Sequence, residues 1–140
     1  MLILNEEDSA NIRTIKSLYL ALKRKDREGL LSLLTKEPVW NVSPGFPGSG
    51  IYRGIVEVFG EFYPKLLANF ESFGAHPDRF IDSENTVVVL GHYHIVGKHV
   101  PNKIEVRFSH CWDIDKDGCV KGVWQVADSG LIQRDVTTAL

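Results

Sequence analysis

An imidazole and a carboxyl group in the second half of the chain have the chemistry needed to move a proton. His110 stands in "RFSHCW", where it alternates with Phe108 and Trp112, so the three side chains share one face of a predicted strand. Asp128 ends the last predicted strand, in "VADSG". Burial lowers the pKa of an imidazole and raises that of a carboxyl group, which suits both to acid–base catalysis. The plainer alternatives are a hydrogen-bonded core histidine and an aspartate that caps the terminal turn.

Aromatic side chains from both halves of the chain could form the walls of a small apolar site. Those expected to contact a flat or cyclic ligand are Trp40, Phe46, Tyr52, Tyr63, Trp112 and Trp124. Tyr93, in "GHYH", is the expected hydrogen-bond donor to a developing enolate oxygen. Gln125 joins the site if its strand pairs so that it shares a face with His110. One bulge beside Gly118 would reverse that parity, so the register stays open.

Two further patterns suggest metals. His92 and His94 form an H-x-H pair on one strand face, with His99 close in sequence, and histidines on one face can bind a transition metal. The favoured interpretation is that one of the histidines, counting His110 with them, lines a cavity and that the others lie at the surface. A cupin-type site would also need a nearby Glu and a chain made almost entirely of strands, whereas the first half here is predicted to be helical. No metal and no organic cofactor are therefore predicted.

The stretch "DIDKDG" has the D-x-D-x-D-G spacing that opens an EF-hand calcium loop. Counting from Asp113, the twelfth position, which should be a bidentate carboxylate, is Trp124. The flanks "VRFSHCW" and "CVKGVWQV" are typical of strands and not of helices. We therefore interpret "DKDG" as a hairpin turn in which Gly118 takes a positive φ.

The elements that must position these residues are helices first and strands afterwards. Apolar residues at helical spacing predict a helix over 6–25, and Asp26 is a good N-cap for a shorter second helix. "EPVWNV" is a short strand candidate, "SPGFPGSGIYRG" is predicted to be a loop, and "IVEVFGEFY" to be a third helix continued from Pro64. Strands are predicted over 71–81, 86–97, 104–115 and 119–128. This order predicts an α+β fold with one curved antiparallel sheet.

Composition excludes several classes of function. The 140 residues suit a single domain over 1–140, and a net charge of −2 argues against nucleic acid as a partner. The longest uncharged run is rich in Gly and Pro, so no membrane partner is expected, and no signal peptide is expected either. Cys111 and Cys119 fit a reducing compartment, which predicts a cytoplasmic protein with free thiols.

Several segments, taken in order, resemble the SnoaL-like polyketide cyclase branch of the nuclear transport factor two-like superfamily. They are the Trp followed by a P-G-x-P-x-x-G-x-Y-x-G loop, the G-x-Y and F-x-H-x-W strands and the terminal D-[TS]. In this chain they comprise Trp40, Pro44, Gly45, Pro47, Gly50, Tyr52, Gly54, Gly91, Tyr93, Phe108, His110, Trp112, Asp128 and Ser129. The ordered set covers nearly the whole chain.

The resemblance implies a cone-shaped, strongly bent antiparallel sheet packed on N-terminal helices, with a mostly apolar pocket in the mouth of the cone. It also implies a homodimer that pairs through the outer face of the sheet. The superfamily contains isomerases, cyclases, dehydratases, epoxide hydrolases and non-catalytic domains, so fold alone does not settle function.

The favoured hypothesis is proton abstraction next to a carbonyl of a small apolar or cyclic ligand, leading to isomerisation, cyclisation or dehydration. Asp128 or His110 acts as the base, and the other, or Tyr93 or Tyr63, hydrogen-bonds the enolate oxygen. Asp128→Asn and His110→Ala are each expected to abolish turnover. The alternatives are a non-catalytic ligand-binding or dimerisation domain and a protein–protein adaptor. A packed interior in which Asp128 only caps the terminal turn would favour a non-catalytic domain.

Overall fold

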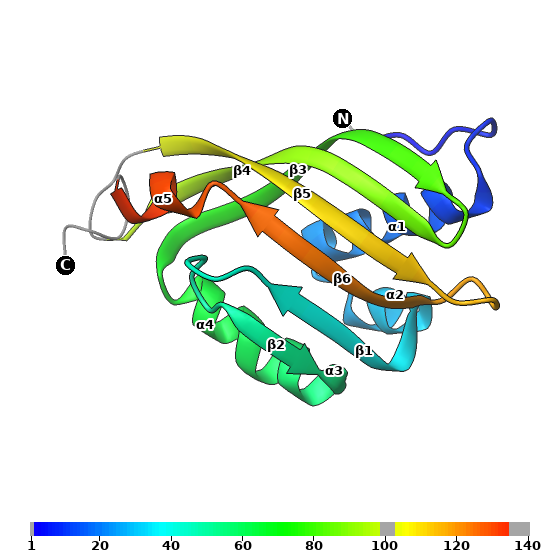
Figure 1. The fold of residues 1–140 in the computed structure, drawn as a ribbon, viewed down its shortest axis with the longest axis horizontal. Coiled ribbons are helices and arrows are strands. Elements are labelled where there is room, and N and C mark those ends of the chain that lie inside the picture. Colours follow the sequence, from blue (N-terminus) through cyan, green and yellow to red (C-terminus); the bar gives the residue numbers. More distant parts are fainter. Residues whose placement is uncertain (1, 99–102, 135–140) are drawn as a thin grey trace.

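The computed structural model describes residues 2–98 and 103–134 and has the predicted α+β architecture. Six strands form one twisted, curved sheet, and the N-terminal helices pack against one of its faces (Figure 1). The predicted fold class is confirmed. Among the described residues no helix is long and apolar enough to cross a membrane.

The two predicted N-terminal helices are present, and the first begins four residues later than predicted. Helix α1 spans Ala10–Arg24, and the Ser9 side chain accepts a hydrogen bond from the Ile12 N–H at its start. Lys25 then adopts the left-handed conformation, with φ of 55°, and ends the helix. Helix α2 spans Arg27–Leu33, and Asp26 caps it by accepting from the Gly29 N–H, as predicted.

The third predicted helix is confirmed as one helical segment with a π-helical turn in its middle. It consists of α3 at Gly54–Glu57, η1 at Val58–Phe62 and α4 at Tyr63–Leu67. Pro64 lies at the start of α4, as predicted. A last short helix, α5 at Ser129–Ile132, follows the final strand and places Ile132 fully in the core.

The sheet has the strand order β2-β1-β6-β5-β4-β3. Its long strands are close to the predicted ranges: β3 at Phe70–Ser83, β4 at Thr86–Gly97, β5 at Lys103–Ile114 and β6 at Val120–Ala127. They pair as the predicted antiparallel meander. The turn between β5 and β6 has Gly118 at φ of 84°, and the Asp115 carboxylate accepts from the N–H groups of Asp117 and Cys119.

Two features of the sheet differ from the sequence-based prediction. Strand β1, Leu34–Val42, runs parallel to β6, so one pairing is not antiparallel. Strand β2, Gly50–Arg53, lies inside the segment that we predicted to be a loop, and it pairs antiparallel with β1. Its four residues are too few to show a periodic pattern, and the Gly and Pro residues before it dominate the local signal.

Strict alternation divides the sheet into a buried and an outer face. On β5 the buried side chains are Val106, Phe108, His110, Trp112 and Ile114. Together with the matching residues of β4 and β6 they pack against α1 and form the core. Burying one large apolar side chain contributes about 1.5–3 kcal/mol, so this face supplies much of the driving force for folding. His110 and Gln125 are the buried polar residues among these apolar neighbours.

Candidate functional site

His110 lies between two tyrosine hydroxyls. Its Nδ1 is 2.5 Å from the Oη of Tyr19, which comes from α1, and its Nε2 is 2.6 Å from the Oη of Tyr93 on β4. His110 is 7% exposed, Tyr19 is 5% and Tyr93 is 4%. The structure thus brings two of the three predicted catalytic residues together, and it adds Tyr19 from the predicted N-terminal helix.

Fixed donors stand at both ends of this chain of hydrogen bonds. The indole N–H of Trp112 donates to Tyr19 Oη over 2.9 Å. The side-chain amide of Gln125 donates to Tyr93 Oη over 3.1 Å. Its orientation is set by the backbone N–H of Ser43, which can only donate and lies 3.2 Å from Gln125 Oε1. We call Trp112, Tyr19, His110, Tyr93 and Gln125 the tyrosine–histidine chain.

Burial keeps every member of this chain neutral. Desolvation lowers the pKa of His110 to about 3, since an imidazolium would lose its hydration there. Desolvation also raises the pKa of Tyr93 far above its usual value, partly offset by the hydrogen bond from Gln125. The pKa of Tyr19 is raised for the same reason, with the Trp112 bond acting in the opposite direction. At neutral pH the chain therefore holds neutral imidazole and neutral phenol groups.

The register of the last two strands settles which predicted residues share this interior. His110 pairs directly with Gln125 across β5 and β6, so both side chains point to the same face. Trp124, the neighbour of Gln125, must then point the other way, and it is 52% exposed on the outer face. Its predicted place in the ligand pocket is wrong, because adjacent residues of one strand cannot both line the same face.

Asp128 also lies apart from the tyrosine–histidine chain. It is exposed, and its Oδ1 accepts a hydrogen bond from the Leu131 N–H, which caps α5. This is the capping alternative considered for Asp128 from the sequence. Asp128 borders an open hollow of about 520 Å³ together with Phe108 and Leu131. His110 does not border that hollow.

Aromatic rings surround Tyr93 and His110. Phe46 lies 5.5 Å from Tyr93 between ring centroids, Phe73 lies 4.7 Å away and Phe108 lies 4.5 Å away. Phe108 also stacks on His110 at 3.9 Å. Phe46 comes from the loop between β1 and β2 and is 3% exposed, so its ring closes this interior from the loop side.

The remaining predicted ligand-binding residues lie beside this group. Trp40 packs edge-on against Trp112 at 5.5 Å, and its indole N–H donates to Tyr63 Oη over 3.2 Å. Desolvation raises the pKa of Tyr63 to about 12. Tyr52 is engaged elsewhere, since its hydroxyl donates to the Gly48 carbonyl over 2.6 Å and its ring packs against Phe62.

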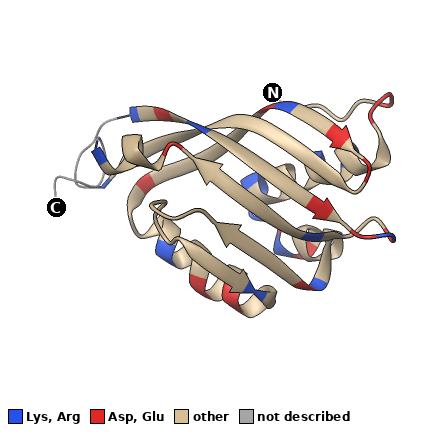
Figure 2. Cartoon of the chain, viewed as in Figure 1, with Lys and Arg blue, Asp and Glu red and all other residues tan. Residues whose placement is uncertain are grey.

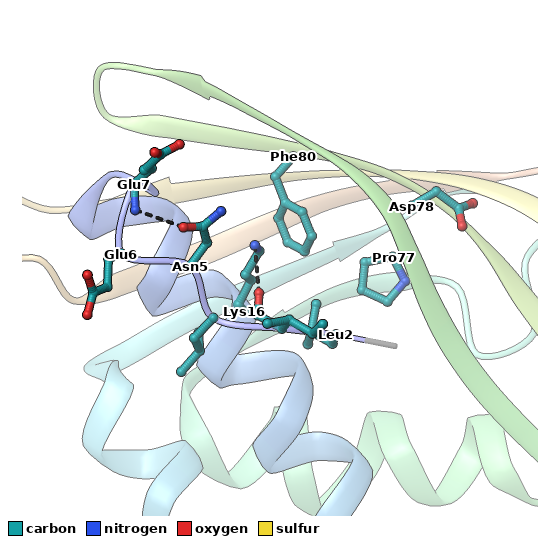
Figure 3. A pocket seen from close by; sticks show the side chains of 10 residues that line it. Leu2, Asn5, Glu6, Glu7, Lys16, Pro77, Asp78 and Phe80 are labelled. Carbon is teal, nitrogen blue, oxygen red and sulfur yellow. Dashed lines mark hydrogen bonds between the residues drawn. The ribbon is translucent and has the colours of Figure 1, made fainter.

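A larger hollow lies at the β3 edge of the sheet, between the N-terminal segment and α1, and is not the candidate site. It has a volume of about 750 Å³ and is walled by residues 2–7, Lys16 on α1, and Pro77, Asp78 and Phe80 on β3 (Figure 3). The ammonium group of Lys16 is already engaged by the Asp8 carboxylate at 2.7 Å and by the Ile3 carbonyl at 2.9 Å. This ammonium group is therefore already paired within the protein.

The outer histidines form surface pairs. His92 contacts the Asp78 carboxylate, and His94 lies 3.3 Å from Glu105. The rings of His76 and His94 stack at 3.9 Å. In the described part of the chain no three His, Cys, Asp or Glu residues are grouped to hold a metal, and His99 lies outside the described residues.

Sequence analysis did not identify Tyr19 or Ser43 as parts of the site. Tyr19 follows Ile12 and Ile15 on the apolar face of α1, where its ring suits the core. The feature that could have indicated its role is the hydroxyl, because a buried tyrosine needs a hydrogen-bond partner. Ser43 acts through its backbone N–H, which every non-proline residue has, so residue type gave no signal for it.

Solved structures show how widely this fold occurs. An NTF2-like protein of unknown function from Burkholderia pseudomallei is 25% identical, with a TM-score of 0.83 over 93% of this chain and 99% of that one. TerC, co-crystallised with polyporic acid, is 22% identical, with a TM-score of 0.81 over 92% and 99%. Rv0760c from Mycobacterium tuberculosis, in complex with estradiol-17β-hemisuccinate, is 18% identical, with a TM-score of 0.67 over 84% and 93%.

None of the curated proteins matches this chain significantly. The family assignment comes instead from a model of the SnoaL-like domain, which matches residues 15–123. That range begins within α1 and includes the loop with Phe46 and the strands that carry Tyr93 and His110. With most of its length matched and with NTF2-like structural neighbours, the chain belongs to the SnoaL-like domain family of the NTF2-like superfamily.

Proposed function

We propose that this SnoaL-like protein binds a small, flat or cyclic carbonyl compound and removes a proton next to its carbonyl group. The observation that carries the proposal is the buried Tyr93 hydroxyl, which accepts from Gln125 and is bonded to His110. A polar group desolvated among aromatic rings binds a ligand oxygen more strongly than the same group in water, because no solvent competes for it.

Tyr93 is the proposed donor to the carbonyl oxygen. When a neighbouring C–H loses its proton, negative charge develops on that oxygen, and a hydrogen bond from Tyr93 then strengthens. His110 holds the Tyr93 oxygen in place from one side and Gln125 from the other. Enolisation of this kind is the first step shared by isomerisation, aldol-type cyclisation and some dehydrations.

The ligand size follows from the rings around Tyr93. Phe46, Phe73 and Phe108 present apolar surfaces that suit a flat ring system. Phe46 now occupies the space beside Tyr93, so a ligand enters by displacing that ring together with its loop. The complexes of TerC with polyporic acid and of Rv0760c with estradiol-17β-hemisuccinate support ring-containing ligands for this fold.

Asp128 is the proposed base. Both ring nitrogens of His110 are engaged by tyrosines, which leaves no lone pair free for a C–H proton. Asp128 borders the hollow beside Phe108, the residue whose ring also stacks on His110 and packs against Tyr93. For this role Asp128 must leave its cap on α5, so the proposal requires the terminal helix to shift when a ligand binds.

Deuterium uptake by 1-tetralone, a cyclic aromatic ketone, tests the proposal without knowledge of the natural substrate. In D₂O the hydrogens next to its carbonyl exchange at the rate of enolisation, which NMR follows directly. We expect the wild-type protein to accelerate the uptake and Tyr93→Phe to reduce the acceleration by about 100-fold, the usual loss for one oxyanion donor. Ser72→Ala, which removes an exposed hydroxyl on β3, is the control.

The non-catalytic alternative has its own supporting observation, the cap that Asp128 makes on α5. The affinities of the protein for 1-tetralone and for the hydrocarbon tetralin, which lacks the carbonyl group, are compared by titration. Ketone binding that depends on Tyr93, together with no acceleration of deuterium exchange, would support this alternative. Absence of both Tyr93-dependent binding and exchange would refute a carbonyl site altogether.

We also propose that the chain forms a homodimer through the outer face of its sheet. Strand register places Val88, Cys111, Trp124, Asn41 and Ile51 in one row across that face. Trp124 and Ile51 are each 52% exposed. Charged residues lie mainly toward the ends of the strands, and the middle of the strand layer is largely uncharged (Figure 2). An exposed tryptophan in an uncharged row is typical of an interface.

The cytoplasm is the proposed location. Cys111 and Cys119 are both free thiols in the structure, which suits a reducing compartment. Neither cysteine takes part in the hydrogen bonds of the tyrosine–histidine chain.

A further inference from the structure

The tyrosine–histidine chain has a donor fixed at each of its two ends. Trp112 has only an indole N–H to offer, so the Tyr19 oxygen must accept from it. The Gln125 amide is held with its oxygen toward the Ser43 N–H, so its NH₂ group faces Tyr93 and the Tyr93 oxygen must accept. Neither tyrosine can therefore donate outward along the chain.

Between these ends there are more hydrogens than hydrogen bonds. Two bonds join Tyr19 to His110 and His110 to Tyr93. Three hydrogens are available for them, one on each tyrosine hydroxyl and one on the neutral imidazole. One hydroxyl hydrogen is therefore left over, and among the residues that the structure describes neither tyrosine has a further acceptor.

The surplus hydrogen can lie at either end, depending on the imidazole tautomer. If Tyr19 donates to Nδ1, the proton on His110 is on Nε2 and is donated to Tyr93, whose own O–H is then free. If Tyr93 donates to Nε2, the proton is on Nδ1 and the O–H of Tyr19 is free. The two arrangements use the same heavy-atom positions and differ only in hydrogens.

The surroundings of the two tyrosines distinguish these arrangements. Tyr19 is enclosed by its own helix and by the rings of Trp112 and Phe80. Tyr93 contacts Phe46, which belongs to the loop between β1 and β2, and its amide partner Gln125 is held by Ser43 at the start of the same loop. A free O–H on Tyr93 can thus meet a ligand that displaces a loop residue, whereas one on Tyr19 lies beneath α1.

We infer that Tyr19 is a positioning residue that donates to Nδ1 of His110, holds the proton of His110 on Nε2 and so leaves the Tyr93 O–H free for a ligand. The inference rests on the proposed function for the place of the ligand, and it adds the chemical class. The ligand atom at Tyr93 is an oxygen without hydrogen, as in a ketone, a quinone or an enolate. A hydroxyl at that point would have no acceptor for its own hydrogen unless it rotated away.

The tautomer of His110 in the full-length protein is the direct test. Two-bond ¹⁵N–¹H correlations show which ring nitrogen carries the proton, and we expect Nε2 in the wild type. In Tyr19→Phe the donor to Nδ1 is lost. The arrangement that then satisfies most acceptors has Tyr93 donating to Nε2. We therefore expect the imidazole proton to move to Nδ1 and the ¹⁵N chemical shifts of the two ring nitrogens to be interchanged.

Tyr63→Phe is the matched control, because it also removes a hydroxyl that accepts from an indole but has no hydrogen bond to His110. We expect it to leave the His110 tautomer on Nε2. A wild-type proton on Nδ1 would overturn the inference, whether or not Tyr19→Phe folds, and so would an unchanged tautomer in folded Tyr19→Phe. Tyr93-dependent exchange of 1-tetralone with a proton on Nδ1 would refute this inference alone. A proton on Nε2 without any Tyr93-dependent ketone binding or exchange would refute the proposed function alone.

Discussion

The Oη of Tyr19 lies 2.5 Å from Nδ1 of His110, although 91 positions separate the two residues in the chain. The first comes from the N-terminal helix and the second from the fifth strand, so their contact couples the helix layer to the sheet at one buried point. Because Tyr93 bonds the other ring nitrogen, one imidazole holds together three elements of the fold.

Burial of His110 predicts a specific dependence of stability on pH. Its pKa is about 3 in the folded chain and about 6.5 in the unfolded chain, so between these pH values the unfolded chain is protonated there and the folded chain is not. The free energy of unfolding therefore falls as the pH falls, and this residue accounts for about 2 kcal/mol between pH 7 and pH 5.

Urea denaturation of the wild type and of His110→Gln at both pH values measures this contribution, since the other histidines cancel in the difference. We expect the wild type to lose about 2 kcal/mol more than the variant on acidification. An equal loss in both proteins would show that the imidazole titrates in the folded state near its usual pKa.

Gly122 is expected to tolerate no side chain, because β1 and β6 approach each other closely there. A Cβ at this position would lie 2.3 Å from the Val39 carbonyl oxygen. Gly122→Ala should therefore lower the free energy of unfolding by about 1–3 kcal/mol, the usual range for overpacking. The same strand pairing aligns Trp40 and Val42 with the residues around Gln125, so the hydrogen bond from Ser43 should weaken as well.

Gly60→Ala is the control for that substitution. A Cβ at Gly60 would have nothing within 4 Å, and the residue lies inside a helical segment. We expect this variant to gain about 0.5–1 kcal/mol, as is usual when alanine replaces a helical glycine. Equal thermal denaturation midpoints for the two variants would argue against the close approach of β1 and β6.

The dimer proposal predicts that a charge at Trp124 separates the protomers. Trp124→Glu places a carboxylate in the middle of the uncharged row on the outer face, where a partner sheet would have to desolvate it. Sedimentation velocity should show a dimer for the wild type and a monomer for this variant. Val56→Glu is the control, since Val56 is 81% exposed on α3 and is not part of the row, and it should leave the dimer intact. A monomeric wild type would refute the proposal.

Two substitutions at Asp128 distinguish its role as the N-cap of α5 from its proposed role as the base. Asparagine is as good an N-cap as aspartate, so Asp128→Asn should keep α5 and the thermal midpoint while losing the carboxylate. Asp128→Ala loses both and should cost about 1 kcal/mol of unfolding free energy. If Asp128 is the base, both variants lose the acceleration of 1-tetralone exchange. Full exchange activity in Asp128→Asn would assign this residue to the cap alone.

Much of the fold followed from local patterns in the sequence. Apolar spacing and capping residues located α1 and α2, and alternating residues located β3 to β6 to within a few positions. The same alternation placed His110 on one face with Phe108 and Trp112. These predictions succeed because helix and strand periods are properties of neighbouring residues, whatever the rest of the chain does.

The tertiary structure alone decided which polar groups meet. The register between β5 and β6 shifts at Asp113 and Ile114, and this irregularity fixes Gln125 opposite His110 and turns Trp124 outward. Packing of α1 against the sheet then brings Tyr19 to the second nitrogen of His110. Such contacts depend on long-range register and on the space left between elements, and one residue of slip in a strand would reverse every side chain in it. For that reason the sequence alone could nominate His110 and Tyr93, whereas their partners Tyr19 and Ser43 emerged only from the folded chain.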